Sequence, residues 1–197
     1  MTTRDLPLFP LRAVFFPGGR IALQVFEARY LDLMSRSLRD GSDFGIVNIT
    51  QGNEVRRAGD DETQFASVGV TVRIDQVDMP RSGLMLVSLM AQRRFRMGAV
   101  SVVDNGLWTT QALDLPDDPA AAPLPERAAL VEMLRNLMAR FEGRGTPFAG
   151  EPRWNDAGWV ANRWSELLPI EASERQALLE VDDPHERLAR VAQWLDV

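Results

Sequence analysis

Arg93, Arg94 and Arg96 surround Phe95 and form the one basic cluster in this sequence that has an aromatic residue inside it. On a strand, Arg94 and Arg96 share one face, while Arg93 and Phe95 share the other. A strip of guanidinium groups of this kind can bind phosphates or acidic peptide segments through charge-assisted hydrogen bonds. The competing interpretation is a solvated strand face with Phe95 pointing into the core.

Catalytic chemistry has few residue types to draw on, because the chain has no cysteine, no lysine and one histidine, His185. Thiol chemistry, Schiff bases, cysteine-ligated metals and multi-histidine metal sites are thereby excluded. His185 falls in the first turn of the last predicted helix, where the helix dipole disfavours an imidazolium. No G-x-S-x-G motif supplies a nucleophile, so we expect no catalytic residue, no metal site and no cofactor. A hydrolase that depends on His185 is the least favoured alternative.

Two acidic clusters and one glycine-containing segment have simpler interpretations. Asp60-Asp61-Glu62 and Asp182-Asp183 are runs of neighbouring residues. Their side chains diverge, so we interpret them as a solvated loop and a helix cap. Phe16-Pro17-Gly18-Gly19 lacks the Gly-Lys-Ser/Thr ending of a phosphate-binding loop, and it predicts a turn between strands.

The composition is typical of a soluble globular protein, since 45% of the 197 residues are apolar and 25% are charged. The net charge of −6 argues against nucleic acid and anionic membranes as general partners. No apolar run approaches the roughly 18 residues of a membrane span. Pro7, Pro10 and Pro17 interrupt the N-terminal region, which lacks the apolar run of a signal peptide. We therefore expect a cytoplasmic protein with no membrane association.

A proline-rich segment at residues 116–125 divides the chain. Repeated proline fixes the backbone and removes hydrogen-bond donors, which is typical of a linker. The hydrophobic period is mostly 2 before this segment and mostly 3.6 after it. The sequence therefore predicts an α+β fold in two parts, a β-barrel subdomain at residues 1–116 and a helical subdomain at residues 117–197.

The first part is predicted to be a small sheet with one helix. Its clearest strand is Val68–Asp75, where apolar residues alternate with polar or small ones. Further strands are expected at residues 6–11, 21–26, 44–49 and 107–115, and residues 84–100 are expected to form a long strand or a bent strand pair. A helix is predicted over 27–40, with Gly41 as its stop. Because closure of a sheet removes exposed edges, we expect a small barrel.

The second part is predicted to be a bundle of four helices. A stripe from Leu130 to Phe141 and a second from Trp159 to Leu168 mark the first two helices. Ser173 with Gln176 is interpreted as a capping box of the third, with Glu171–Arg175 as a supporting ion pair. The fourth is expected to begin with Asp183 as N-cap, Pro184 and Glu186.

Several of these segments together resemble a known family. Leu6–Arg12, then Phe16-Pro17-Gly18 and Leu23–Phe26 before a helix, resemble the opening of the N-terminal substrate-binding domain of the ATP-dependent protease Lon. Val68–Val72 followed by Gln92–Arg96 is similar to the central hairpin of that family. Leu167-Leu168-Pro169-Ile170 and Asp183–Leu188 resemble its Leu-Pro motif and its terminal motif. The resemblance covers nearly the whole chain.

The resemblance implies a PUA-like small barrel with one helix, followed by a C-terminal helical bundle. It also implies recognition of unfolded or extended polypeptide segments. A Lon protease continues into an ATPase module and a Ser–Lys protease, whereas this chain ends at Val197 and has no lysine. We therefore expect a free-standing, ATP-independent module that is not an enzyme, with a protease or chaperone as a candidate partner.

The side chains expected to bind such segments are apolar residues taken to be exposed, together with the arginine cluster. They are Phe15, Phe16, Phe26, Arg93, Arg94, Arg96 and Trp154. Exposed apolar patches of this kind bind extended chains. The alternative is an RNA-binding module that acts through a PUA-like barrel, which rests on analogy of fold and is opposed by the net charge of −6.

Overall fold

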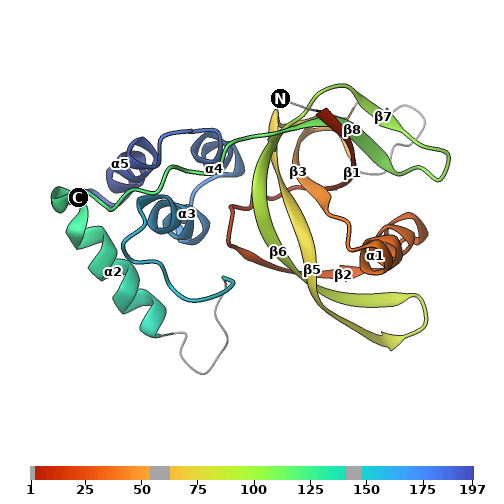
Figure 1. Cartoon of the computed structure of the whole chain (residues 1–197), viewed down its shortest axis with the longest axis horizontal. Helices are drawn as coiled ribbons and strands as arrows, with labels where there is room; N and C mark the ends of the chain where they lie inside the picture. The colour runs from red at the N-terminus through yellow and green to blue at the C-terminus, as the bar shows by residue number, and fades with distance from the viewer. Residues whose placement is uncertain (1–2, 54–62, 141–147) are drawn as a thin grey trace.

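The computed structural model describes residues 3–53, 63–140 and 148–197. It shows a β-half, residues 3–115, beside a helical half, residues 125–197, with the proline-rich linker running between them (Figure 1). The strands are β1 (Thr3–Leu11), β2 (Arg20–Val25), β3 (Phe44–Gln51), β4 (Gln64–Phe65), β5 (Val68–Arg81), β6 (Leu84–Arg96), β7 (Val100–Val102) and β8 (Trp108–Asp114). The helices are α1 (Ala28–Asp40), α2 (Ala128–Ala139), α3 (Ala157–Leu167), α4 (Ala172–Leu179) and α5 (Pro184–Trp194), with a short 3-10 helix, η1 (Pro125–Arg127). The predicted α+β class is confirmed.

Strand pairing in the β-half runs in a circuit. β6 pairs with β5, β5 with β3, β3 with β1 and β1 with β8, and β8 returns to β6 through Phe95↔Asp114 and Arg96↔Leu113. The β1–β3 pair is parallel, and the intervening chain supplies the crossover that a parallel pair requires. Among the described residues, β2 pairs only with β6 and β7 pairs only with β8, so both are edge strands.

Two strand boundaries differ from the predicted ones. β5 continues beyond the predicted Asp75 to Arg81, and it forms with β6 a long hairpin closed at Ser82 and Gly83, where Gly83 has a φ of +75°. Of the two forms predicted for 84–100, a long strand or a bent strand pair, the structure has two strands, because β6 ends at Arg96 and β7 begins at Val100. The chain bends at Gly98, where a Cβ atom would lie 2.5 Å from the carbonyl oxygen of Gln111.

Helix ends follow local signals with one exception. α1 ends at Gly41, which has a φ of +63°, and α5 begins with Asp183 as N-cap and Pro184 at its first position, as predicted. The predicted capping box of α4 is wrong, because Glu171 is the N-cap and pairs with Glu174. Phe141 and the cluster Asp60-Asp61-Glu62 lie outside the described residues.

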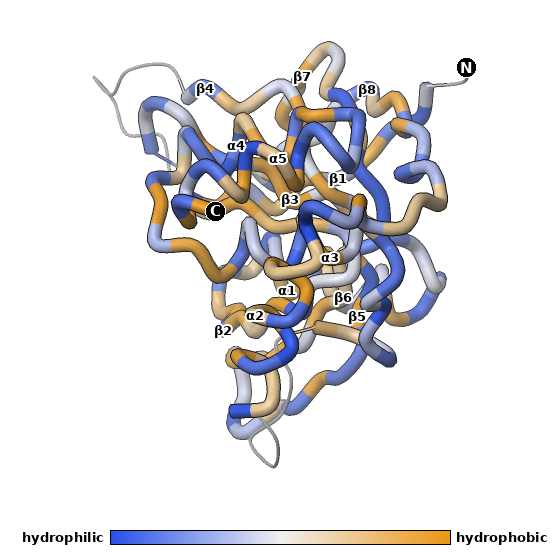
Figure 2. The backbone as a smooth tube through the Cα atoms, turned by 90° about the vertical axis from the view of Figure 1, so that its left-hand side faces the viewer, coloured by the Kyte–Doolittle hydropathy of each residue, from blue (hydrophilic) through white to orange (hydrophobic). Residues whose placement is uncertain are grey.

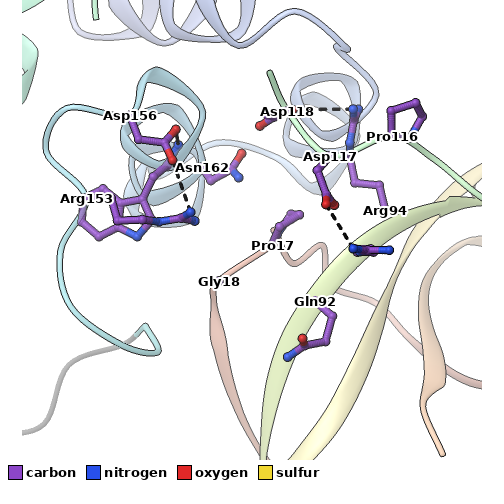
Figure 3. Close-up of a pocket in the computed structure, with 12 residues that line it drawn as sticks. Pro17, Gly18, Gln92, Arg94, Pro116, Asp117, Asp118, Arg153, Asp156 and Asn162 are labelled. Carbon is purple, nitrogen blue, oxygen red and sulfur yellow. Dashed lines mark hydrogen bonds and ion pairs between the residues drawn. The ribbon is translucent and has the colours of Figure 1, made fainter. Parts of the chain in front are cut away.

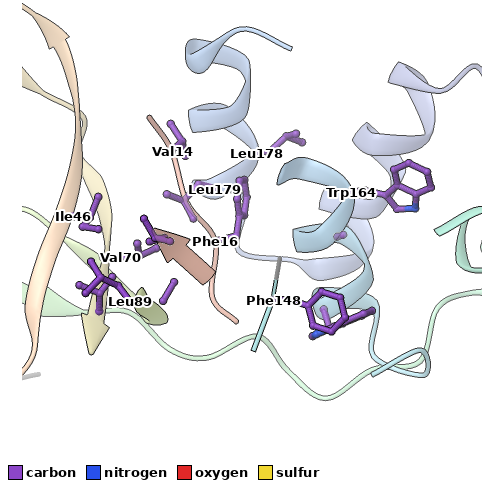
Figure 4. Close-up of a cluster of buried hydrophobic side chains, with 14 of the residues drawn as sticks. Val14, Phe16, Ile46, Val70, Leu89, Phe148, Trp164, Leu178 and Leu179 are labelled. Carbon is purple, nitrogen blue, oxygen red and sulfur yellow. The ribbon is translucent and has the colours of Figure 1, made fainter. Parts of the chain in front are cut away.

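A single apolar core extends through both halves. It joins Phe16, Val70 and Leu89 of the β-half to Trp164 and Leu179 of the helical half (Figure 4). A smaller cluster on the β-half contains Leu6, Leu8, Val47, Phe95, Trp108 and Ala112. The domain boundary predicted between residues 116 and 117 falls in the linker. Because the two halves share one core, the division into two separate domains stays a prediction.

The hydropathy of the chain alternates over short distances, with apolar and polar stretches following one another along the tube (Figure 2). No helix among the described residues is both long and apolar enough to cross a membrane.

Candidate functional site

A polar cleft of about 290 Å³ lies where the two halves meet, and we call it the seam cleft (Figure 3). Gln92 and Arg93 of β6 line one side, and Arg153 and Asp156 of the helical half line the other. Asp117 of the linker lies against Arg93, with 3.3 Å between the carboxylate and the guanidinium. The cleft therefore carries charges of both signs and has no strong preference for either.

Arg94 also borders this cleft, but its guanidinium is enclosed. The residue is 5% exposed, and Nη1 donates to the carbonyl oxygens of Leu179 at 3.0 Å and Val181 at 3.1 Å. The same nitrogen lies 3.1 Å from the Asp182 carboxylate. Burial, followed by repulsion from Arg187, lowers the pKa of Arg94 below its ordinary value. Arg94 therefore joins β6 to the α4–α5 connection and is not free to bind a partner.

The predicted face of Arg94 and Arg96 therefore does not give two exposed arginines. The β5–β6 register is regular from Val70↔Arg94 to Val68↔Arg96, since the shift lies between Val70 and Val72, and the two arginines differ because the α4–α5 connection covers Arg94. Phe95 and Arg94 are both buried, whereas Arg96 is exposed. The cluster presents two separate exposed arginines, Arg93 and Arg96, rather than a strip.

Asp118 and Arg187 form the centre of the same buried network, and neither was singled out from the sequence. Arg187, 1% exposed, donates from Nη1 to Asp118 Oδ2 at 2.6 Å and from Nη2 to Oδ1 at 3.0 Å. Asn162 Oδ1 accepts a further bond from Arg187 at 2.8 Å. Gly158 is needed beside this pair, since a Cβ atom there would lie 2.5 Å from Asp118 Oδ2. Helical spacing could have predicted the burial of Arg187, because it places this residue on the same face of α5 as Pro184 and Val191.

Phe16 lies in the core and not on the surface. Its exposed fraction is 0%, and it packs between the strands of the β-half and the helices (Figure 4). The expectation that Phe16 binds a partner as an exposed side chain is therefore wrong. The predicted turn at this segment does form, with Gly19 N–H donating to the Phe16 carbonyl at 3.0 Å. Phe15 is half-buried beside Met138 in a hollow of about 200 Å³.

Glu166 and Arg163 of α3 hold this turn against the helical half. Glu166 Oε1 accepts from Phe16 N–H at 3.3 Å, and Arg163 Nη2 donates to the Pro17 carbonyl at 2.8 Å. Burial raises the pKa of Glu166 to about 7, although Arg163 Nη2 lies 3.2 Å from its carboxylate and opposes the shift. At Gly19 a Cβ atom would lie 2.2 Å from Glu166 Oε1, so a side chain there would displace this carboxylate.

A second surface surrounds β2, and we call it the β2 surface. Phe26 at the end of β2 is 69% exposed, and Met79 on the β5–β6 hairpin is 59% exposed. An open hollow of about 460 Å³ takes in Leu23, Val77 and Leu86. A smaller hollow of about 160 Å³ takes in Leu11, Leu23, Val25, Phe26 and Tyr30. Large apolar side chains and two hollows thus gather around an edge strand.

The remaining candidate residues lie apart from the β2 surface. Trp154 is half-buried and packs edge-to-face on Trp159 at 5.1 Å, with the guanidinium of Arg135 5.1 Å from its ring. His185 is partly exposed in the first turn of α5. Within residues 3–53, 63–140 and 148–197, no group of three or more His, Cys, Asp or Glu side chains is placed to hold a metal ion. Of the predicted residues, the structure brings together only Arg93 and Arg94, with Trp154 next to the cleft-lining Trp159.

Comparison with known proteins gives one consistent family. Residues 5–197 match the family described as the ATP-dependent protease La (LON) substrate-binding domain. The chain is 32% identical to Lon protease 1 of Sorangium cellulosum over 98% of its own length and 24% of that protein. It is 28% identical to Lon protease 2 of Herpetosiphon aurantiacus over 97% of its own length and 23% of that protein. The chain thus spans about a quarter of the length of these relatives.

Solved structures agree with the sequence comparison. A crystal structure of a Lon N-terminal domain protein from Xanthomonas campestris is 34% identical, with a TM-score of 0.77 over 97% of this chain and 98% of that one. The N-terminal domain of a Mycobacterium avium complex Lon protease shares the fold at 18% identity, with a TM-score of 0.65. The chain belongs to the family of Lon substrate-binding domains.

Proposed function

We propose that this chain is a non-catalytic module that binds unfolded or extended polypeptide segments through the β2 surface. The observation that carries the proposal is the exposure of Phe26 and Met79 around two apolar hollows. Membership of a substrate-binding domain family supports a binding role. A PUA-like barrel is part of the same proposal, and it is supported by the circuit of strand pairing through β6 and β8.

The physical case rests on what an unfolded chain exposes. Apolar side chains that a folded protein would bury stand in water, and each contributes about 1.5–3 kcal/mol when it is fully removed from water. The larger hollow has room for such side chains. The exposed Met79 follows its lining residue Asp78 along the chain, and the exposed Phe26 lines the smaller hollow. Binding of this kind depends on apolar side chains and main chain rather than on one sequence, as recognition of varied segments requires.

The exposed arginines have a secondary part in this proposal. Arg93 lies 3.3 Å from Asp117, so an acidic segment must replace that carboxylate to gain the same contact. Arg96 is exposed at the end of β6 and is the simpler contact for an acidic side chain. Phe15 and Trp154 keep part of their rings accessible and are proposed as minor contacts. A protease or chaperone that receives the bound segment is the proposed partner.

The proposal is tested by titration with reduced, carboxymethylated lactalbumin, a permanently unfolded protein. We expect micromolar binding, and the double variant Phe26→Ser/Met79→Ser should weaken it roughly tenfold or more, because two apolar contacts are lost. The matched control is Leu124→Ser/Trp194→Ser, which removes two exposed apolar side chains from the helical half and should bind like the wild type. No binding by the wild type, or an equal loss in both double variants, contradicts the proposal.

A parallel titration with single-stranded RNA addresses the alternative function. Salt-dependent binding that disappears in Arg93→Gln/Arg96→Gln would favour an RNA-binding module. We expect no such binding, because Arg94 is enclosed and the two exposed arginines do not form a continuous strip.

A further inference from the structure

The outer edge of β2 carries main-chain groups that the fold leaves unused. The antiparallel register pairs Ala22 with Ser88 and Gln24 with Leu86 on β6. At the start of this ladder, Ala91 N–H donates to the Gly19 carbonyl at 2.9 Å. Hydrogen-bonded and non-hydrogen-bonded pairs alternate in an antiparallel ladder, so the N–H and C=O groups of Ala22 and Gln24 point away from β6. Both residues are exposed, and no described residue pairs with β2 on that side.

The two apolar hollows meet at this edge strand, where both take in Leu23 and Gln24, and extend to different faces of it. The larger continues over Ala22 and its cross-strand neighbours Leu86 and Ser88, and the smaller continues over Val25 to Phe9 and Tyr30. Positions 22 and 25 differ by an odd number, so their side chains lie on opposite faces of β2. A strand added beside β2 would present its own side chains alternately to the same two faces, and therefore alternately to the two hollows.

Fixed charges near β2 are already compensated within the fold. The Arg20 guanidinium lies 3.2 Å from the Asp75 carboxylate, and the Arg29 guanidinium lies 2.9 Å from the Glu27 carboxylate. The features offered at this edge are thus main-chain donors and acceptors and apolar surface. Another extended backbone with apolar side chains is the partner that matches all of them.

We propose that β2 accepts one extended polypeptide segment of about six residues as an added antiparallel or parallel strand, with apolar side chains at successive positions entering the two hollows. This inference rests on the proposed function and specifies how the bound segment is held. Strand addition predicts that full affinity requires main-chain N–H groups of both β2 and the bound segment. Apolar contact with Phe26 and Met79 alone would not require them.

The test removes one outward N–H from β2. Gln24→Pro deletes a donor that β6 does not use, and proline is tolerated on an edge strand. Gln24→Ala keeps the donor and serves as the reference for loss of the side chain. Val102→Pro makes the equivalent change on β7, another edge strand, whose Val103 N–H and Ala99 carbonyl already bond to β8 neighbours. For carboxymethylated lactalbumin we expect Gln24→Pro to bind about five- to tenfold more weakly than Gln24→Ala, the loss of one hydrogen bond, while Val102→Pro stays within about twofold of the wild type.

A second measurement leaves the protein unchanged. The probe is a peptide with about six successive valine residues between charged ends, together with the same peptide N-methylated at every valine. We expect the methylated peptide to bind the wild type at least about fivefold more weakly, because it cannot donate to the β2 carbonyls. This comparison holds even if Gln24→Pro is too unstable to use.

The outcomes separate the two proposals. If Phe26→Ser/Met79→Ser weakens binding but Gln24→Pro and N-methylation do not, strand addition is overturned and the proposed function stands. If the wild type binds neither probe, the proposed function itself fails. If sedimentation of the protein alone shows a dimer that Gln24→Pro dissociates, β2 pairs with a second copy, and the inference is overturned in favour of self-association.

Discussion

The buried guanidiniums of Arg94 and Arg187 at the seam between the two halves are paired, whereas main-chain groups at the outer edge of β2 are open. At the seam, the buried guanidiniums of Arg94 and Arg187 meet the carboxylate of Asp118 and the carbonyls around Val181. At β2, the main-chain groups of Ala22 and Gln24 have no described partner on one side, and apolar hollows flank them. The buried charges at the seam join the two halves of the fold, whereas the open main-chain groups and apolar surface at β2 are where we propose that a partner binds.

This contrast explains why an arginine-rich stretch is a poor guide to binding here. Freeing a guanidinium that is buried among carbonyl oxygens and a carboxylate breaks a buried ion pair, which costs about 3–5 kcal/mol of free energy and opposes binding to a partner. The predictions below test the two regions separately. Those at the seam should change stability and leave binding intact, and those at β2 should do the reverse.

The largest effect is expected at Asp118. Asp118→Ala leaves the buried Arg94 and Arg187 without their shared carboxylate, and removing one partner of a buried ion pair costs about 3–5 kcal/mol of unfolding free energy. The neighbouring Asp117→Ala removes an exposed carboxylate and should cost about 0–1 kcal/mol. Urea denaturation of the two variants measures the difference. Equal losses would show that the seam is not a buried network.

A smaller effect, dependent on pH, is expected at Glu166. Its pKa is about 7 in the folded protein and close to 4.5 when unfolded, so the folded state binds more protons between these values. Stability from this group is therefore complete below about pH 4.5 and is lost as the pH rises through about 7. Relative to Glu166→Gln, the wild type should lose on the order of 2–3 kcal/mol between pH 5 and pH 8. An equal change of unfolding free energy with pH in the wild type and in Glu166→Gln would contradict this role of Glu166.

An intermediate case is Trp154, which lies near the seam but keeps part of its ring accessible. Trp154→Ala removes the edge-to-face contact with Trp159 and the contact with Arg135, which together are worth about 1–2 kcal/mol of stability. Affinity for carboxymethylated lactalbumin should fall no more than about twofold, consistent with a minor contact. A tenfold loss of affinity with unchanged stability would move the binding surface from β2 to the helical half.

The smallest effect on stability is expected at Phe26. Because its side chain is 69% exposed, Phe26→Ser should change the unfolding free energy by less than about 0.5 kcal/mol. The same variant should weaken polypeptide binding measurably. Thermal denaturation and titration on one preparation give both values, and a destabilised variant would mean that Phe26 is a structural residue.

Local signals made much of the fold predictable. Gly41 ends α1 because glycine adopts a positive φ without strain, and Asp183-Pro184 begins α5 because both residues suit a helix start. The predicted capping box of α4 begins two residues too late. Ser173 with Gln176 and Glu171 with Glu174 both have the three-residue spacing of a capping box, and the structure uses the second pair. Edge-strand status and the circuit through β6 and β8 depend on contacts between distant segments, which local patterns do not encode.

The candidate site was less predictable for the same reason. Alternation predicted that Arg94 is exposed with Arg96, but the carbonyls of Leu179 and Val181 and the distant Asp118 enclose it. The Phe15-Phe16-Pro17 turn was predicted, whereas the choice of Phe16 as the buried ring depends on helices far along the chain. Exposure of Phe26 agrees with the prediction, because it stands between an edge strand and a helix start.

Amide hydrogen exchange with and without carboxymethylated lactalbumin tests the central claim most directly, because it maps the contact at single residues. Binding at the β2 surface should slow exchange at Ala22 and Gln24, whose N–H groups point outward, and leave Gln92 and Arg93 of the seam cleft unchanged. Unchanged exchange at Ala22 and Gln24 under saturating probe, with slowing confined to the seam cleft, would contradict the account.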